Sequence, residues 1–275
     1  MKLRNIAIIA HVDHGKTTLV DKLLQQSGTF SERAELVERA MDSNDLEKER
    51  GITILAKPTA LKWRDYRINI VDTPGHADFG GEVERIMSMV DSVILLVDAV
   101  DGPMPQTRFV TQKAFAHNLK PIVVINKIDR DGARPDWVLD QTFDLFDMLG
   151  ATDEQLDFPV IYASAIQGYA VADHNDTSDN MDVLFQTIID EVPPPPVELD
   201  APFQMQISQL DYSSYLGVIG IGRVKQGKVI VNSPVSVIDA AGNVRNGRVG
   251  KIFGFHGLER VDIDTAEAGD IIALT

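Results

Sequence analysis

A short polar turn near the start of the chain has the composition of a phosphate-binding loop. The apolar run Ile6–Ala10 breaks at His11, and Gly15-Lys16-Thr17 then opens a stretch with helical character. In such a loop, backbone N–H groups surround the phosphates, the Lys16 ammonium neutralises the outer ones and the Thr17 hydroxyl ligates Mg²⁺. The signature normally opens with Gly, and Ala10 stands in that place. We predict that the following residues bind a nucleotide: Asp13, His14, Gly15, Lys16, Thr17 and Thr18.

A second motif, Asn126-Lys127-Ile128-Asp129, has the residues to select the base. A carboxylate accepts two hydrogen bonds from adjacent donors, and guanine presents N1–H and N2–H₂ side by side. Adenine lacks that pair of donors, so adenine in the same site would leave buried polar groups unpaired. Asp129 therefore favours guanine. Taken alone, the tetrapeptide is equally compatible with a solvated turn. Its position after a phosphate loop, in the order of a parallel sheet, favours guanine recognition.

A third group of residues could act on the terminal phosphate. Asp72 is placed to hold Mg²⁺ through water, and the Gly75 N–H can meet the γ-phosphate. His76 is the candidate that orients the attacking water, although a turn histidine with a surface hydrogen bond is the alternative. Thr53, in the polar segment Arg50-Gly-Ile-Thr53, could add a second hydroxyl to Mg²⁺ when the γ-phosphate is present.

These motifs need a scaffold that brings them to one edge, and the apolar pattern predicts a parallel sheet. Runs rich in Ile and Val suit strands buried on both faces. Helix-like stretches alternate with them, which predicts an α/β domain with a mostly parallel, doubly wound sheet. Ligands in such sheets bind beyond the carboxyl ends of the strands, and every predicted strand except the third ends in unusual polar residues. The predicted strands are Ile6–Ala10, Ile68–Val71, Val93–Val97, Ile122–Ile125 and Pro159–Tyr162, the helices are Thr17–Gln26, Gly81–Val90, Thr107–His117, Trp137–Leu149 and Met181–Val192, and the crevice collects Asp13–Thr17, Asp72–His76, Asn126–Asp129 and Ser164–Ala165.

The proline run Pro193–Pro196 divides the chain. Four consecutive prolines cannot continue a helix and favour a stiff, extended linker. Short β-rich runs with glycine punctuation follow, which predicts a small β-barrel. We expect a GTP-binding (G) domain over residues 1–197 and a β-barrel domain II over residues 198–275, truncated at its C-terminal end. The strand-like runs are Phe203–Ile207, Val218–Val224, Lys228–Val231, Val235–Ile238, Arg248–Phe253 and Ile271–Thr275.

Composition restricts the compartment and the partners. The chain has no cysteine, no apolar run of membrane-spanning length and no signal peptide before the first strand, so we expect a cytoplasmic protein without membrane contact. Lys and Arg balance Asp and Glu in residues 201–275, so the net charge of −15 lies in residues 1–200. This acidity matches nucleic acid poorly, so we expect no DNA binding, and a basic surface for any RNA is either local or lies beyond this sequence. Acidity that serves solubility is the alternative interpretation.

The motifs, their order and their spelling resemble those of the translational GTPases. The longer spellings Met41–Arg50 and Asp98–Thr107 resemble the BipA/TypA family, whose members are ribosome-binding relatives of elongation factor G. Ala10 in place of glycine is shared with this elongation factor G-like branch. The five guanine-nucleotide motifs correspond to Ala10–Thr17, Arg50–Thr53, Asp72–His76, Asn126–Asp129 and Ser164–Ala165.

The resemblance implies a P-loop GTPase domain that binds GTP or GDP with Mg²⁺ and whose hydrolysis is stimulated by the large ribosomal subunit. In that family the equivalent of His76 is swung toward the water by the sarcin–ricin loop of ribosomal RNA. Val12 and Ile52 match the apolar pair, or hydrophobic gate, that flanks this histidine, and Asp13 matches a residue linked to a monovalent cation. The family is associated with large-subunit assembly and with growth under cold or other stress. We expect a monomer, and the family's later domains lie outside this sequence.

Two other functions remain open. The chain could be a GTP-dependent binding or assembly module with little turnover, which a lack of ribosome-stimulated phosphate release would favour. It could also be a true elongation factor that promotes translocation or delivers tRNA, although the spelling Ser43-Asn-Asp-Leu46 argues against this.

Overall fold

The computed structural model describes residues 1–29, 58–73 and 80–275. Contacts between residues divide the chain into two compact units, Met1–Pro194 and Pro195–Thr275. The division falls inside the run of four prolines, slightly before the boundary at residue 197 that the sequence predicts. Each unit is described by itself.

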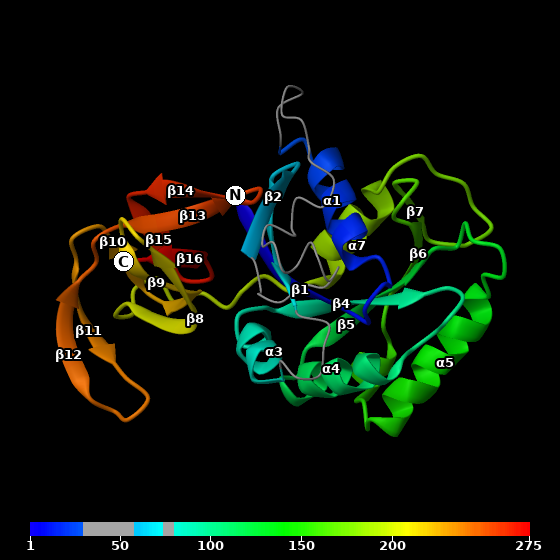
Figure 1. Ribbon diagram of the computed structural model, residues 1–275, viewed down its shortest axis with the longest axis horizontal. Helices are drawn as coiled ribbons and strands as arrows, with labels where there is room; N and C mark the ends of the chain where they lie inside the picture. Colours follow the sequence, from blue (N-terminus) through cyan, green and yellow to red (C-terminus); the bar gives the residue numbers. More distant parts are fainter. Residues whose placement is uncertain (30–57, 74–79) are drawn as a thin grey trace. The chain divides into compact units, whose positions relative to one another are not determined.

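The first unit is built on a seven-stranded sheet in the order β2-β3-β1-β4-β5-β6-β7 (Figure 1). The five central strands run parallel, and the two edge strands, β2 and β7, run antiparallel to their neighbours. In this register Asp98 lies opposite Asn126. Because the central strands are parallel, their carboxyl ends lie along one edge of the sheet. The strands are β1 (Lys2–Ala10), β2 (Pro58–Trp63), β3 (Tyr66–Asp72), β4 (Ser92–Asp98), β5 (Lys120–Asn126), β6 (Val160–Ser164) and β7 (Tyr169–Val171).

Helices cover both faces of this sheet. Helices α1 and α7 lie on one face, and α3, α4 and α5 lie on the other (Figure 1). Helix α1 buries Leu19, Val20, Leu23 and Leu24, an apolar stripe with the spacing of a helix packed on a core. Helices α4 and α5 begin at a proline, which suits the first helical position because its missing N–H would have no partner there. The helices are α1 (Lys16–Gln26), α3 (Gly80–Met87), α4 (Pro105–Ala116), α5 (Pro135–Met148), α6 (Asp153–Leu156) and α7 (Asp182–Glu191).

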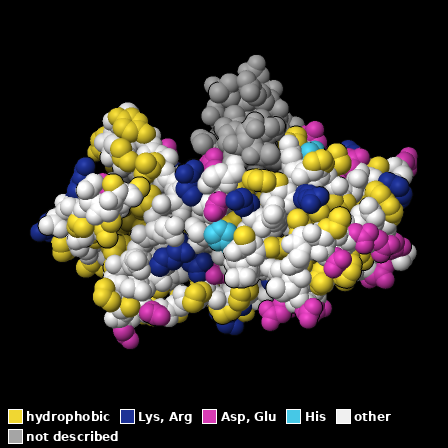
Figure 2. Space-filling model, turned by 90° about the horizontal axis from the view of Figure 1, so that it is seen from below, with side chains coloured by type: hydrophobic (Ala, Val, Ile, Leu, Met, Phe, Trp, Pro, Cys, Tyr) yellow, Lys and Arg dark blue, Asp and Glu magenta, His cyan; other side chains and the backbone are white. Residues whose placement is uncertain are grey.

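The acidity of the first two hundred residues is visible on this unit. Figure 2 shows Asp and Glu side chains gathered toward the end of the unit that carries α5. Helix α5 itself exposes Asp136, Asp140, Asp144 and Asp147. This face repels phosphate backbones. Within the described ranges, no helix is both long and apolar enough to cross a bilayer.

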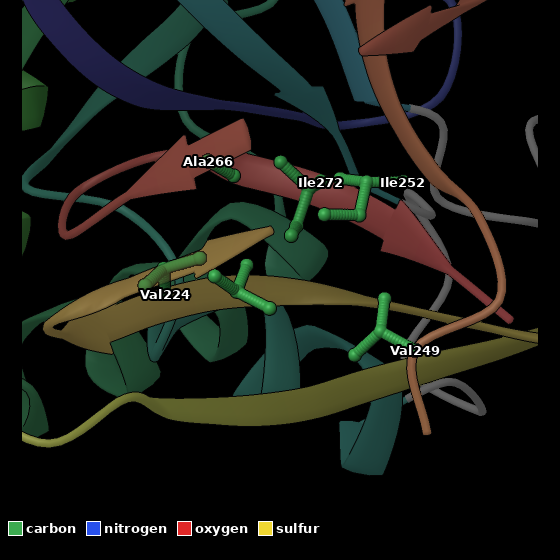
Figure 3. Close-up of a cluster of buried hydrophobic side chains, with 6 residues drawn as sticks. Val224, Val249, Ile252, Ala266 and Ile272 are labelled. Atoms are coloured by element: carbon green, nitrogen blue, oxygen red, sulfur yellow. The ribbon is translucent and has the colours of Figure 1, made fainter. Parts of the chain in front are cut away.

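The second unit consists of antiparallel strands. They form a five-stranded sheet in the order β14-β13-β16-β9-β8 and two two-stranded sheets, β10-β15 and β11-β12. Its core includes a cluster that contains Val224, Val249, Ile252 and Ile272, all buried between the strands (Figure 3). The strands are β8 (Gln204–Ser213), β9 (Gly217–Gln226), β10 (Lys228–Ile230), β11 (Pro234–Ile238), β12 (Val244–Arg248), β13 (Ile252–His256), β14 (Glu259–Ile263), β15 (Thr265–Glu267) and β16 (Ile271–Leu274).

The predicted fold class, a mostly parallel α/β domain followed by a β domain, is confirmed. One predicted strand, Arg248–Phe253, is wrong, because β12 ends at Arg248 and β13 begins at Ile252. The prediction that the third strand lacks a polar end is also wrong, since β4 ends at the buried Asp98. This residue becomes important at the site.

Candidate nucleotide-binding site

The turn between β1 and α1 has the backbone of an anion-binding loop. Asp13 and Gly15 adopt left-handed conformations, with φ of 66° and 93°. A Cβ on Gly15 would lie 2.5 Å from Nδ2 of Asn126, so only glycine fits there. Left-handed turns of this kind direct successive N–H groups into one concavity, and α1 begins directly after it at Lys16. The loop and the positive end of the helix dipole together suit a phosphate.

Asn126 joins three of the predicted motifs at the end of β5. Its Nδ2 donates to the His14 carbonyl at 2.9 Å, and its Oδ1 accepts from the Ala165 N–H at 2.9 Å. The side chain is 1% exposed. Each bond contributes about 1 kcal/mol net, but a buried amide left without its partner costs about 1–3 kcal/mol. Asn126 therefore fixes the loop after β1 against the loop after β6.

Lys127 lies between a buried carboxylate and the phosphate loop. Its Nζ is 2.6 Å from Oδ2 of Asp98 and donates to the Asp13 carbonyl at 2.5 Å. Lys127 has φ of 66°, a conformation that costs a non-glycine residue about 1–2 kcal/mol. The two contacts help to offset this cost, and they hold the aliphatic part of the Lys127 side chain against the phosphate loop.

Asp98 is a further residue of the candidate site, and the sequence motifs assign it no role. It is fully buried, and its Oδ1 accepts the Val100 N–H at 2.8 Å. Burial raises the pKa of Asp98, but the hydrogen bonds from Lys127 and Val100 outweigh this and hold the pKa below its usual value. The carboxylate is therefore ionised at neutral pH. Its signal in the sequence is a lone acid directly after a run of buried aliphatic residues.

Lys16 and Asp72 meet on the other side of the loop. Nζ of Lys16 is 2.7 Å from Oδ1 of Asp72 and also donates to the Thr73 carbonyl. The Thr73 hydroxyl donates to the Ile8 carbonyl at 2.8 Å, which ties the end of β3 to β1. Asp72 is 1% exposed, and Thr17 follows Lys16 in the first turn of α1. Carboxylate and hydroxyl oxygens are the hard donors that Mg²⁺ prefers, so this donor set fits the ion.

The side chain of His14 points into the fold. It is 2% exposed, and its Nδ1 lies 3.3 Å from the Leu96 carbonyl and 3.4 Å from the Asp98 N–H. Burial is the main cause that lowers the pKa of His14, so the ring is neutral at pH 7. His14 is among the residues that the sequence predicts to bind the nucleotide. Because the ring is buried, only the main chain of His14 lies at the loop. Val12 and Thr18, on either side of the loop, are partly exposed.

Asp129 lies exposed in the turn after β5. Burial is the first cause that raises the pKa of Tyr169, and the charge of Asp129 is the second, which places this carboxylate near β7. Ser164, fully buried at the end of β6, accepts the Gln167 N–H at 3.3 Å and so shapes the turn that follows Ala165. Four predicted residues lie outside the described part of the chain: Ile52, Thr53, Gly75 and His76.

Comparison with known proteins identifies the family. Residues 1–194 match the model of the elongation factor Tu GTP binding domain. The chain belongs to this family. It is also 74% identical over 274 residues to the large ribosomal subunit assembly factor BipA of Escherichia coli strain K12, and 72% identical over 275 residues to BipA of Haemophilus influenzae. Each alignment covers 100% of this chain and 45% of the relative, so the chain spans less than half the length of these relatives.

The resemblance to BipA/TypA translational GTPases is thereby confirmed, and the match to the family model supports a GTP-binding domain over residues 1–194. Two solved structures share the fold. Bacterial selenocysteine-specific elongation factor EF-Sec gives a TM-score of 0.74 at 23% identity, covering 100% of this chain and 42% of that one. Elongation factor SelB from Methanococcus maripaludis, in complex with the GTP analogue GppNHp, gives 0.72 at 24% identity, covering 100% and 52%. At these identities the similarity extends to the fold alone.

Proposed function

We propose that the chain binds GTP and GDP at the edge of its parallel sheet and hydrolyses GTP with Mg²⁺. The observation that carries this proposal is the position of Asn126, which hydrogen-bonds to His14 of the phosphate loop and to Ala165 after β6. One buried side chain thus connects a phosphate loop, a base-selecting motif and a third loop. Membership of a family of GTP-binding domains supports the same function.

Each residue has a separate role in the proposal. The backbone of Asp13–Thr18 and the Lys16 ammonium hold the phosphates. Asp129 selects guanine, and Lys127, Ser164 and Ala165 shape the base site. Thr17 and Thr53 would hold Mg²⁺ directly and Asp72 through water. The bound ion would neutralise charge on the phosphate oxygens.

Hydrolysis in this proposal depends on His76. This residue orients the attacking water, and the Gly75 N–H meets the γ-phosphate. Val12 and Ile52 flank the histidine as a hydrophobic gate, and a monovalent cation binds near Asp13. We assign these roles from the motifs, since His76, Gly75 and Ile52 lie outside the described residues.

We further propose that the whole protein is a ribosome-associated switch in large ribosomal subunit assembly, active in stress or cold adaptation. The curated relatives at 72–74% identity are named for that assembly. The partner would be the large subunit, through the sarcin–ricin loop of its RNA. The protein would act as a cytoplasmic monomer, with residues 1–197 as the G domain and residues 198–275 as a β-barrel domain.

Phosphate release from GTP tests this function. We expect slow release from the purified chain in the presence of Mg²⁺, none from ATP, and faster release from the full-length protein when ribosomes are added. His76→Ala should keep nucleotide affinity and lose the stimulated rate. An equally large loss of affinity would show that His76 is mainly structural, and absence of stimulation in the wild type would favour a binding module with little turnover.

A further inference from the structure

Asp98 carries a buried charge that the proposed roles do not use. The residue ends β4 beside Asn126 of β5, and its side chain is fully buried. Two cations approach its Oδ2, Lys127 at 2.6 Å and Arg130 at 3.8 Å. Because an ionised carboxylate in the interior is unfavourable without close partners, the short contact to Lys127 is the one that retains the charge.

The two carboxylate oxygens of Asp98 have different partners. Oδ1 accepts the N–H groups of Val100 at 2.8 Å and Asp101 at 3.4 Å, which folds the loop after β4. Oδ2 faces Lys127. The fold of the loop after β4 therefore requires only a hydrogen-bond acceptor at Oδ1. The ion pair with Lys127 requires the negative charge at Oδ2.

Lys127 connects Asp98 to the phosphate loop. Its ammonium is held between Oδ2 of Asp98 and the carbonyl of Asp13, and its side chain is 17% exposed. The contact crosses from the motif after β5 to the loop after β1. A lysine fixed at both points presents its stem in one place beside the predicted base site, and less side-chain freedom is lost when a ligand binds.

We propose that Asp98 is a positioning residue for guanine nucleotides: it holds Lys127 against the phosphate loop and so slows release of the bound nucleotide. This inference rests on the proposed function, because it requires GDP to bind beside Lys127. It adds to that function a residue outside the five guanine-nucleotide motifs that sets the lifetime of the complex.

The test is the dissociation rate of fluorescent GDP, chased with unlabelled GDP, from the whole chain. Asp98→Asn keeps an oxygen for the Val100 and Asp101 amides and removes the charge, so we expect release about tenfold faster. A tenfold change is at the low end of the effect of losing a charge-assisted hydrogen bond. We expect the low end because Lys127 keeps its bond to Asp13. Asp101→Asn, an exposed acid in the same loop, is the matched control and should change the rate less than about twofold.

A double-mutant comparison separates positioning from a general structural effect. If Asp98 acts through Lys127, then adding Asp98→Asn to Lys127→Met should change release less than about twofold beyond Lys127→Met alone. Independent, multiplying effects would overturn the proposal, as would wild-type release from Asp98→Asn. If Asp98→Asn does not fold, Asp98→Ser supplies a second short acceptor with the same expected result. If neither folds, the residue serves the fold and the proposal is wrong. Failure of the wild-type chain to bind GDP would instead refute the proposed function.

Discussion

Replacing Gly15 by alanine tests whether the phosphate loop is fixed by its contact with Asn126. Gly15 has φ of 93°, and an added Cβ would lie 2.5 Å from Nδ2 of Asn126. Gly28, at the end of α1, offers a matched control. It has φ of 70° and nothing within 4 Å of an added Cβ, so alanine there is strained by its backbone alone.

The two substitutions share one cost and differ in another. A left-handed alanine costs about 1–2 kcal/mol at either position. At Gly15 the Asn126 amide must also move, which breaks its bond to His14 and leaves a buried group unpaired at about 1–3 kcal/mol. We therefore expect Gly15→Ala to lower the free energy of unfolding by about 2–5 kcal/mol, and by about 1–3 kcal/mol more than Gly28→Ala.

Urea unfolding followed by tryptophan fluorescence measures this difference, because both tryptophans, Trp63 and Trp137, lie in the first unit. Gly15→Ala should also lose GDP affinity, and Gly28→Ala should keep it. Equal losses of stability from the two variants would refute the steric argument, since both would then report only backbone strain.

The buried polar groups Asn126 and His14 give two further predictions. Asn126→Ala should lower the free energy of unfolding by about 1–3 kcal/mol, because the His14 carbonyl and Ala165 N–H lose their partner, whereas Asn175→Ala on the surface should change it by less than about 0.5 kcal/mol in the same urea titration. Burial lowers the pKa of His14, so its contribution to stability is complete above the unfolded pKa of about 6.5 and is lost as the pH falls through the lower folded value. Unfolding measured from pH 8 to pH 5 should therefore show a smaller loss for His14→Gln than for the wild type, and parallel curves would contradict this.

The central sheet could be predicted from the sequence because its strands are buried on both faces. Runs such as Ile6–Ala10 and Val93–Val97 contain only apolar residues, all of them buried in the structure. The edge strand β2 begins at a proline and includes an exposed lysine, Lys62, which breaks the pattern. In the second unit, β12 is exposed along its whole length. A strand without a buried face leaves no apolar periodicity to detect.

The candidate site could be predicted to the extent that it lies at strand ends. Ligands bind beyond the carboxyl ends of parallel strands, and this rule alone groups Lys16, Asp72 and Asn126 at one edge of the sheet. The rule does not give the direction of a side chain, so it does not predict that the ring of His14 points into the fold. The pairing of Asp98 with Lys127 depends on the register of β4 against β5, which local sequence does not determine.

The most direct test of the central claim is the base preference of the binding site, measured by calorimetry with GDP, ADP and xanthosine diphosphate. The wild-type chain should bind GDP and reject ADP by about 10⁴-fold or more, because adenine leaves Asp129 unpaired. Asp129→Asn should weaken GDP and bind xanthosine diphosphate, while Asp131→Asn, an exposed acid in the same loop, should behave as the wild type. Binding of ADP as tight as GDP, or an unchanged preference between guanine and xanthine in Asp129→Asn, would contradict the assignment of a guanine-nucleotide site.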